Sequence, residues 1–174
     1  MRTPRRIFTF LLLGLVLSSC GGGPTARTWA GTVCQALGPW RNTISSLTER
    51  AQQQMAAATT PAQAKENLVH LFGGAEQATE TARARIEAAG VPDVDGGDAI
   101  AREFIAALTA MRDAYGRAKS TIDGLATGDA TAFYDGVEAA MTTLNEEYAR
   151  SKLDTTKISS VELRRAFDEV PECQ

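Results

Sequence analysis

The sequence contains a single histidine, His70, and few aromatic residues. One histidine excludes a metal centre built from several histidines, and the Glu-x-x-His pairs that hold iron in helical bundles are absent. Gly-x-Ser-x-Gly, phosphate-binding loops and zinc-ligand spacings do not occur either. Aromatic residues make up only 6% of the chain and no alternating strand pattern is present, which argues against a β-sandwich. We therefore expect an all-α protein that is not an enzyme and holds no metal or cofactor.

Basic residues are outnumbered by acidic residues beyond the first 19 positions. The first 19 residues contain Arg2, Arg5 and Arg6 and no acidic residue, so the remainder has 15 basic and 21 acidic residues, a formal charge of −6. A nucleic-acid-binding protein needs a concentrated basic face. The charge balance argues against a nucleic-acid partner and against electrostatic docking on anionic lipid.

A long hydrophobic run is also missing. The apolar stretch Ile7–Leu17 covers eleven residues, whereas a transmembrane helix needs about 20. It follows a basic start and precedes the small residues Ser18 and Ser19, which is the order of a secretory signal. We expect residues 1–19 to be a signal peptide that is removed; the alternative is a plain secreted protein in which Cys20 is incidental.

The stretch Leu17-Ser18-Ser19-Cys20 resembles the bacterial lipobox. This resemblance implies that Cys20 receives a diacylglycerol before cleavage and anchors the chain at the extracytoplasmic face of the cell membrane. Residues 20–27 are then the lipidated cysteine and a Gly-rich flexible tether. Residues 28–174 form the folded domain.

A wider resemblance extends over the mature chain. The lipobox, the segment from Trp29 to Trp40 around Cys34, the turn Gly90-Val-Pro-Asp-Val before Ala99-Ile-Ala, and the late Cys173 resemble small helical lipoproteins of high-GC Gram-positive (actinobacterial) bacteria. The resemblance implies a surface-attached helical domain. It implies no catalytic residue.

Two cysteines remain once Cys20 is assigned to the lipid. Cys34 and Cys173 lie near opposite ends of the predicted domain, in a compartment where disulfides persist. We expect them to pair, which would stabilise the fold by about 4–5 kcal/mol in the chain-entropy description. The alternative is two free thiols, one of them catalytic, but neither has a histidine nearby in the sequence.

Apolar residues at spacings of three and four predict four helices. The first covers about residues 28–58 and is kinked, rather than broken, at Gly38-Pro39. The second starts at Thr60-Pro61, contains Gly73-Gly74 at a close crossing or bend, and ends at Gly90. The third covers about residues 99–125, and the fourth starts at the N-cap Asp129.

A short fifth helix is expected near the end of the chain. Ser159 and Glu162 have capping-box spacing, and Pro171 stops the pattern. The helix lengths and short connections favour an antiparallel up-down four-helix bundle with this fifth helix at its C-terminus. In such a bundle the fifth helix brings Cys173 back to Cys34.

Few residues are candidates for a functional site. The acidic turn from Asp93 to Asp98 matches a calcium loop poorly, because Phe104 stands where the loop needs a glutamate. Glu103, Glu146 and Glu147 are interpreted as solvated residues, and His70 as a surface or partly buried one. Trp29 and Trp40, three turns apart on the first helix, are the candidate ligand-binding residues, although packing is the more common role for tryptophan.

These observations favour a non-enzymatic binding domain, tethered to the membrane through the lipid on Cys20, whose partner is a protein of the cell envelope. The alternative is a carrier that holds a small apolar molecule or lipid between its helices. That alternative predicts an internal cavity lined by residues such as Phe72, Phe104 and Phe133.

Overall fold

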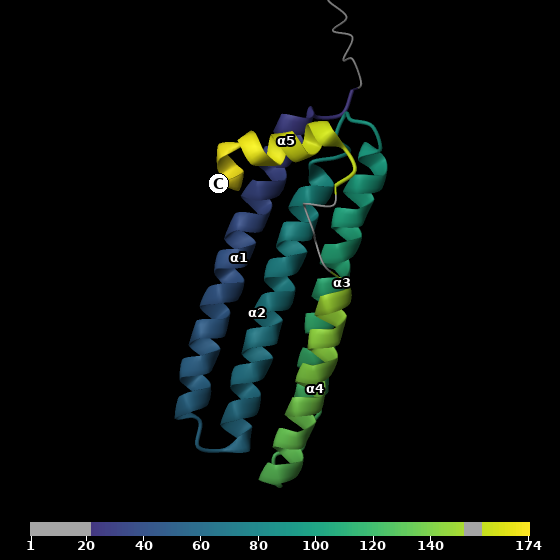
Figure 1. The fold of residues 1–174 in the computed structure, drawn as a ribbon. Coiled ribbons are helices and arrows are strands. Elements are labelled where there is room, and N and C mark those ends of the chain that lie inside the picture. Colours follow the sequence, from purple (N-terminus) through teal and green to yellow (C-terminus); the bar gives the residue numbers. More distant parts are fainter. Residues whose placement is uncertain (1–21, 152–157) are drawn as a thin grey trace, which may run out of the picture.

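A computed structural model describes residues 22–151 and 158–174, and over these residues the chain is helical without any strand. Four long helices run lengthwise and a short one lies across one end (Figure 1). The elements are α1 (Ala26–Ala57), α2 (Pro61–Ala88), α3 (Gly97–Asp123), α4 (Ala130–Arg150), α5 (Val161–Glu169) and the 3-10 turn η2 (Pro171–Cys173).

Side-chain caps start four of the helices. Thr25, Thr60, Asp129 and Ser160 each accept a hydrogen bond from the backbone N–H three residues further on. Such caps satisfy one of the N–H groups that the first turn of a helix leaves free. The predicted caps Thr60 and Asp129 are confirmed. The predicted capping box is one residue out, because Ser160 rather than Ser159 is the cap of α5.

Helix α1 starts earlier than the sequence pattern indicated. The carbonyl of Pro24 accepts a hydrogen bond from the backbone N–H of Asp93 at 2.8 Å. Ala26 is already buried in the core. Residues 24–27, which were assigned to the tether, therefore belong to the folded domain.

Pro39 does not end α1. The helix is continuous through Gly38 and Pro39, as the unbroken spacing of its apolar residues predicted. A proline inside a helix removes one backbone hydrogen bond, so packing on both sides must compensate for the loss. Trp29 and Leu37 before the proline and Ala51 after it are all buried, which supplies that packing.

The core consists of two clusters, one toward each end of the long helices. The first joins α1, α2, α3 and α5 and contains the large buried residues Trp29, Val33, Leu37, Ile86, Phe104, Leu108 and Leu163. The second joins α2, α3 and α4 and contains Leu68, Phe72, Ala114, Ala118, Ile122, Ala140 and Leu144. Alanine is frequent in the second cluster, and small side chains let helices approach closely.

Gly74 marks the close crossing of α1 and α2. A Cβ atom at this position would lie 2.9 Å from both terminal methyl carbons of Leu47 on α1. At Gly73 the nearest atom would be in the side chain of Lys119, at an ordinary 3.6 Å. Of the two glycines, Gly74 is therefore the one that allows the close crossing, and α2 continues past both.

An ion-pair network joins α2 to α3. Glu80 accepts hydrogen bonds from Arg83 at 2.7 Å and from Arg112 at 2.8 Å. These two guanidinium groups lower the pKa of Glu80 to about 2, although partial burial opposes them. Arg112 also bonds Asp113, and Arg83 bonds Glu87. The network favours the charged forms of Glu80, Arg83 and Arg112.

The remaining contacts decide where the last elements lie. Helix α4 packs against α3 and, less extensively, against α2, while α5 and η2 pack against α1. The bundle expected from the sequence has the end of the fourth helix beside the start of the first. In the structure the end of α4, at Tyr148, instead lies across a groove from the middle of α1.

Candidate functional site

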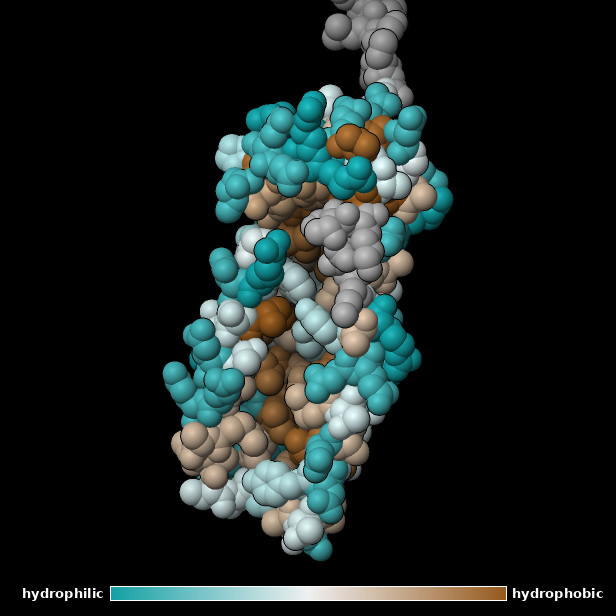
Figure 2. Space-filling view, in the orientation of Figure 1, coloured by the Kyte–Doolittle hydropathy of each residue, from teal (hydrophilic) through white to brown (hydrophobic). Residues whose placement is uncertain are grey.

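The groove between α1 and α4, here called the α1–α4 groove, is the candidate site. It is open to solvent and has a volume of about 490 Å³, which is within the range of small-molecule sites. Figure 2 shows a brown band of hydrophobic side chains along the hollow, with hydrophilic residues at both edges. Its lining consists of Trp40, Arg41, Ile44, Ser45, Thr48, Glu49 and Gln52 from α1, Tyr115 from α3 and Tyr148 from α4.

The groove stays open because the facing surface of α1 is largely polar. In the second half of α1 only Ala51 is fully buried, and Arg41, Ser45 and Gln52 are exposed. Closing α4 onto this surface would remove polar groups from water without giving them partners, which is unfavourable. Helix α4 therefore packs its apolar side on α3.

Trp40 is fixed in the wall of the groove. Its indole Nε1 donates a hydrogen bond to Thr79 Oγ1 at 3.0 Å, and that hydroxyl donates to the carbonyl of Ala75 at 2.7 Å. Thr79 is a fully buried polar residue of α2, and these two hydrogen bonds satisfy its hydroxyl group. The interaction ties α1 to α2 just after the proline and holds the indole ring in one orientation.

Two tyrosines complete the aromatic lining. Tyr115 stacks on Phe72, with ring centroids 6.5 Å apart and ring planes 23° from parallel. Burial raises the pKa of Tyr115 to about 12, and the nearby Tyr148 adds to the rise. Tyr148 itself is 46% exposed and forms the outer edge of the lining. The phenol of Tyr115 is therefore neutral near pH 7.

The structure separates the two tryptophans that the sequence singled out. Trp29 is fully buried, donates a hydrogen bond from Nε1 to the carbonyl of Gly90 at 2.9 Å, and meets the edge of Phe104. Gly90 adopts a positive φ of 74°, which a glycine accepts without strain and which ends α2. Trp29 is thus a core residue, and of the two only Trp40 lines the groove.

The phenylalanines expected around an internal cavity lie in different places. Phe104 belongs to the first core cluster and Phe72 to the second. Phe133 is fully buried on α4 and packs against the ring of Tyr134, with centroids 5.1 Å apart. The structure does not bring the three together.

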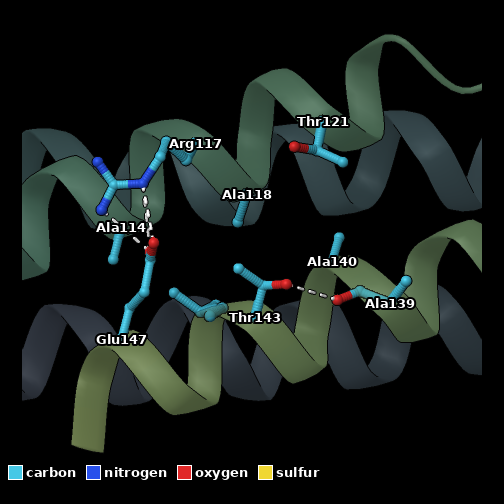
Figure 3. Close-up of a pocket in the computed structure, with 9 residues that line it drawn as sticks. Ala114, Arg117, Ala118, Thr121, Ala139, Ala140, Thr143 and Glu147 are labelled. Carbon is cyan, nitrogen blue, oxygen red and sulfur yellow. Dashed lines mark hydrogen bonds and ion pairs between the residues drawn. The ribbon is translucent and has the colours of Figure 1, made fainter. Parts of the chain in front are cut away.

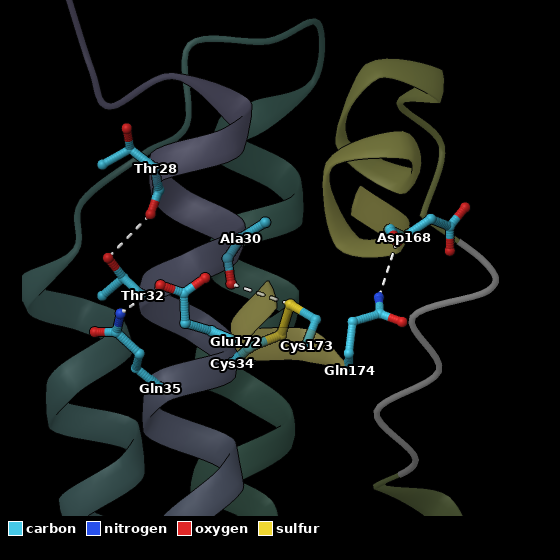
Figure 4. The surroundings of a disulfide bond; sticks show 9 residues. All are labelled: Thr28, Ala30, Thr32, Cys34, Gln35, Asp168, Glu172, Cys173 and Gln174. Atoms are coloured by element: carbon cyan, nitrogen blue, oxygen red, sulfur yellow. Dashed lines mark hydrogen bonds between the residues drawn. A yellow bond between two sulfur atoms is a disulfide. The ribbon is translucent and has the colours of Figure 1, made fainter. Parts of the chain in front are cut away.

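The predicted pair Cys34 and Cys173 is joined at disulfide distance, with Cα atoms 5.1 Å apart. Figure 4 shows the bond between α1 and η2, flanked by a hydrogen bond from Gln35 Nε2 to Glu172 at 3.2 Å. The pairing closes the chain over 139 positions and holds the C-terminal segment on the start of α1. It is a structural cross-link at the end of the molecule away from the α1–α2 loop.

A second, smaller hollow of about 160 Å³ lies between α3 and α4. Figure 3 shows Ala114 and Ala118 facing Ala140 and Thr143 across it, with Arg117 and Glu147 at one end. Arg117 donates to both carboxylate oxygens of Glu147, at 3.1 and 3.0 Å. Both side chains of this pair are already committed to each other. We interpret the hollow as a close helix contact.

The other candidate residues are dispersed. Asp98 pairs with Arg102, Glu146 with Arg150, and Glu103 and His70 are exposed. Within residues 22–151 and 158–174 no three acidic, histidine or cysteine side chains are placed to hold a metal ion. The acidic turn that suggested calcium is instead a helix start: the N-cap of α3 is Gly96, with a positive φ of 72°.

Cys20 and the predicted signal lie outside the described residues. None of the described helices has the length and apolarity needed to span a membrane. Comparison of the chain with family models, curated proteins and solved structures gave no match.

The α1–α4 groove was only partly visible in the sequence. Trp40 was a candidate, but the polar residues of α1 and the two tyrosines were not, because they become neighbours only through the choice of α3 as the partner of α4. One signal was available. Between Arg41 and Gln52 the apolar stripe of α1 narrows to Ile44, Leu47 and Ala51, which leaves the opposite edge of the helix polar.

Proposed function

We propose that this chain is a lipid-anchored binding domain at the extracytoplasmic face of the cell membrane, without enzymatic activity, and that its ligand occupies the α1–α4 groove. The observation that carries the proposal is a groove of about 490 Å³ in which Trp40 and Tyr115 are held by contacts with α2 while the polar side chains face solvent. Concave sites that combine aromatic rings with a few polar groups are typical of ligand binding. The anchor rests on the lipobox-like sequence that ends at Cys20.

The proposal includes the arrangement in which the domain is presented. The antiparallel up-down order of a four-helix bundle, expected from the short connections, remains a prediction. In that arrangement the tether and the disulfide lie at one end of the bundle. The groove then begins beyond this end and points away from the membrane along the bundle.

A matched pair of serines tests the groove. Ser45 and Ser46 are adjacent, exposed residues of α1, and only Ser45 lines the groove. We expect Ser45→Trp to fill the groove and abolish ligand binding, and Ser46→Trp to leave it unchanged. The readout is native mass spectrometry of full-length protein gently extracted from its own membranes, in which a bound ligand appears as added mass. Equal ligand occupancy in both variants would refute the groove as the site.

The same spectra test the anchor. The mature chain is expected to begin at Cys20 and to carry the mass of a diacylglycerol. Cys20→Ala should abolish both the processing and the added lipid mass. A mature wild-type chain that starts elsewhere, or lacks the lipid, would contradict the anchoring proposal and leave the groove proposal standing.

An apolar carrier is the second candidate function. Only the brown band along the groove favours it, because the three phenylalanines of the expected cavity lie apart. A fatty acid that binds to the wild type and not to Ser45→Trp would support it.

A further inference from the structure

The lining of the α1–α4 groove restricts the class of ligand. Ile44 is the one aliphatic residue among the nine that line it; five others are polar or charged and three are aromatic. Grooves that receive an amphipathic helix present aliphatic anchors at helical spacing. A lipid chain would contact the hydrophobic band along the groove (Figure 2) but would make no use of the polar side chains of α1, which would stay in water. The lining therefore fits a ligand that has both apolar faces and hydrogen-bonding edges.

The aromatic faces are held in place before a ligand arrives. Trp40 is fixed by its hydrogen bond to Thr79, and Tyr115 by stacking on Phe72. Rigid rings offer a large contact area while little conformational entropy is lost on binding. Tyr148 of α4 lines the same groove as Tyr115 of α3, so both rings are available to one ligand.

The polar wall offers hydrogen bonds of both kinds. Ser45 and Gln52 can donate and accept, and Thr48, which donates to the carbonyl of Ile44 at 2.9 Å, retains its acceptor capacity. Arg41 and Glu49 stand eight positions apart on this wall. Their opposite charges give the wall no net charge, so it favours neither an anionic nor a cationic ligand.

We infer, on the basis of the proposed function, that the α1–α4 groove binds a neutral oligosaccharide. A pyranose ring carries C–H groups on its faces and hydroxyls around its edge. The faces stack on Trp40 and the two tyrosines, and the hydroxyls bond the polar side chains of α1. The lining from residue 40 to residue 52 extends for about 18 Å along α1, which accommodates a few linked sugar units.

The test titrates the full-length protein with maltotetraose, cellotetraose, chitotetraose and mannotetraose. Tryptophan fluorescence reports binding, because Trp40 lies in the groove and Trp29 is buried in the core. At least one sugar is expected to bind saturably, and Tyr148→Ala to weaken it about tenfold, as expected for the loss of one stacked ring. Gln52→Ala should weaken it about threefold or more.

The matched control is Tyr134→Ala. Tyr134 is on the same helix and is 44% exposed, but it does not line the groove, so its loss should leave sugar binding unchanged. Equal weakening in the two tyrosine variants would overturn the inference. So would the absence of binding by all four sugars at millimolar concentration.

The two proposals fail in different ways. If no sugar binds and Ser45→Trp still abolishes the binding of another ligand, such as sodium myristate, the oligosaccharide inference is wrong and the groove remains the site. If Ser45→Trp affects the binding of no ligand that the wild type holds, the proposed function fails as well.

Discussion

Loss of the Cys34–Cys173 cross-link should destabilise the protein by several kcal/mol. The bond closes a loop of 139 positions, and the chain-entropy relation gives about 5 kcal/mol for a loop of that length. The unfolded chain without the bond samples many more conformations, whereas the folded domain still holds α5 through Leu163 and Val170. The effect therefore acts mainly on the unfolded state.

The assay is urea unfolding followed by circular dichroism. The variant Cys34→Ala/Cys173→Ala is compared with oxidised and reduced wild type; reduced wild type keeps both sulfur atoms and so separates the cross-link from packing. At a slope of about 2 kcal/mol per molar urea, the midpoint should fall by about 2.5 M. The slope itself should rise, because the unfolded chain becomes more expanded.

A fall of less than about 1 kcal/mol in the free energy of unfolding, with an unchanged urea slope, would contradict this prediction. That result would mean that the C-terminal segment is held by its apolar contacts with α1 and that the cross-link does not restrict the unfolded chain.

Three further predictions concern stability. Glu80→Gln should lower the free energy of unfolding by only about 1 kcal/mol near pH 7, because solvent screens a partly exposed ion pair. The pKa of Glu80 is about 2 in the folded state and 4.5 in the unfolded state, so the difference between wild type and variant should disappear as the pH falls from 4.5 to 2. A difference that stays constant with pH would contradict this. In thermal melts, Gly73→Ala should leave stability unchanged or raise it by about 0.5–1 kcal/mol. Gly74→Ala should be less stable than Gly73→Ala, because the added Cβ meets Leu47. Equal effects of the two substitutions would contradict the close crossing. Tyr115 should ionise near pH 12 in an ultraviolet titration of the folded protein. From pH 10 upward the wild type should lose stability relative to Tyr115→Phe, because the unfolded state releases the phenol proton that the folded state still retains.

Much of the helical structure could be predicted from local sequence signals. The caps Thr60 and Asp129, the continuity of the first helix through Pro39, and the stop at Gly90 all depend on residues within one or two turns. The pairing of Cys34 with Cys173 followed from a count of cysteines and the expected path of the last helix. These features needed no knowledge of which helices pack together.

The groove depends on packing choices that the sequence pattern did not determine. Trp29 and Trp40 lie on the same helix, yet Trp29 is fully buried and meets Phe167 of α5, whereas Trp40 is partly buried and lines the groove. The placement of α4 on α3 decides which side of α1 faces solvent, and the apolar stripe of α4 was compatible with either neighbour. Local periodicity gives the apolar face of a helix but not its partner.

The most direct test of the central claim is photocrosslinking in cells that export the full chain. A benzoylphenylalanine replaces Ser45 in one variant and Ser46 in the other, and irradiation joins it to whatever molecule lies within reach. The account predicts that the variant at position 45 acquires a specific added mass and that the variant at position 46 does not. Adducts at both positions to the same extent, or at position 46 alone, would contradict the assignment of the α1–α4 groove as the binding site.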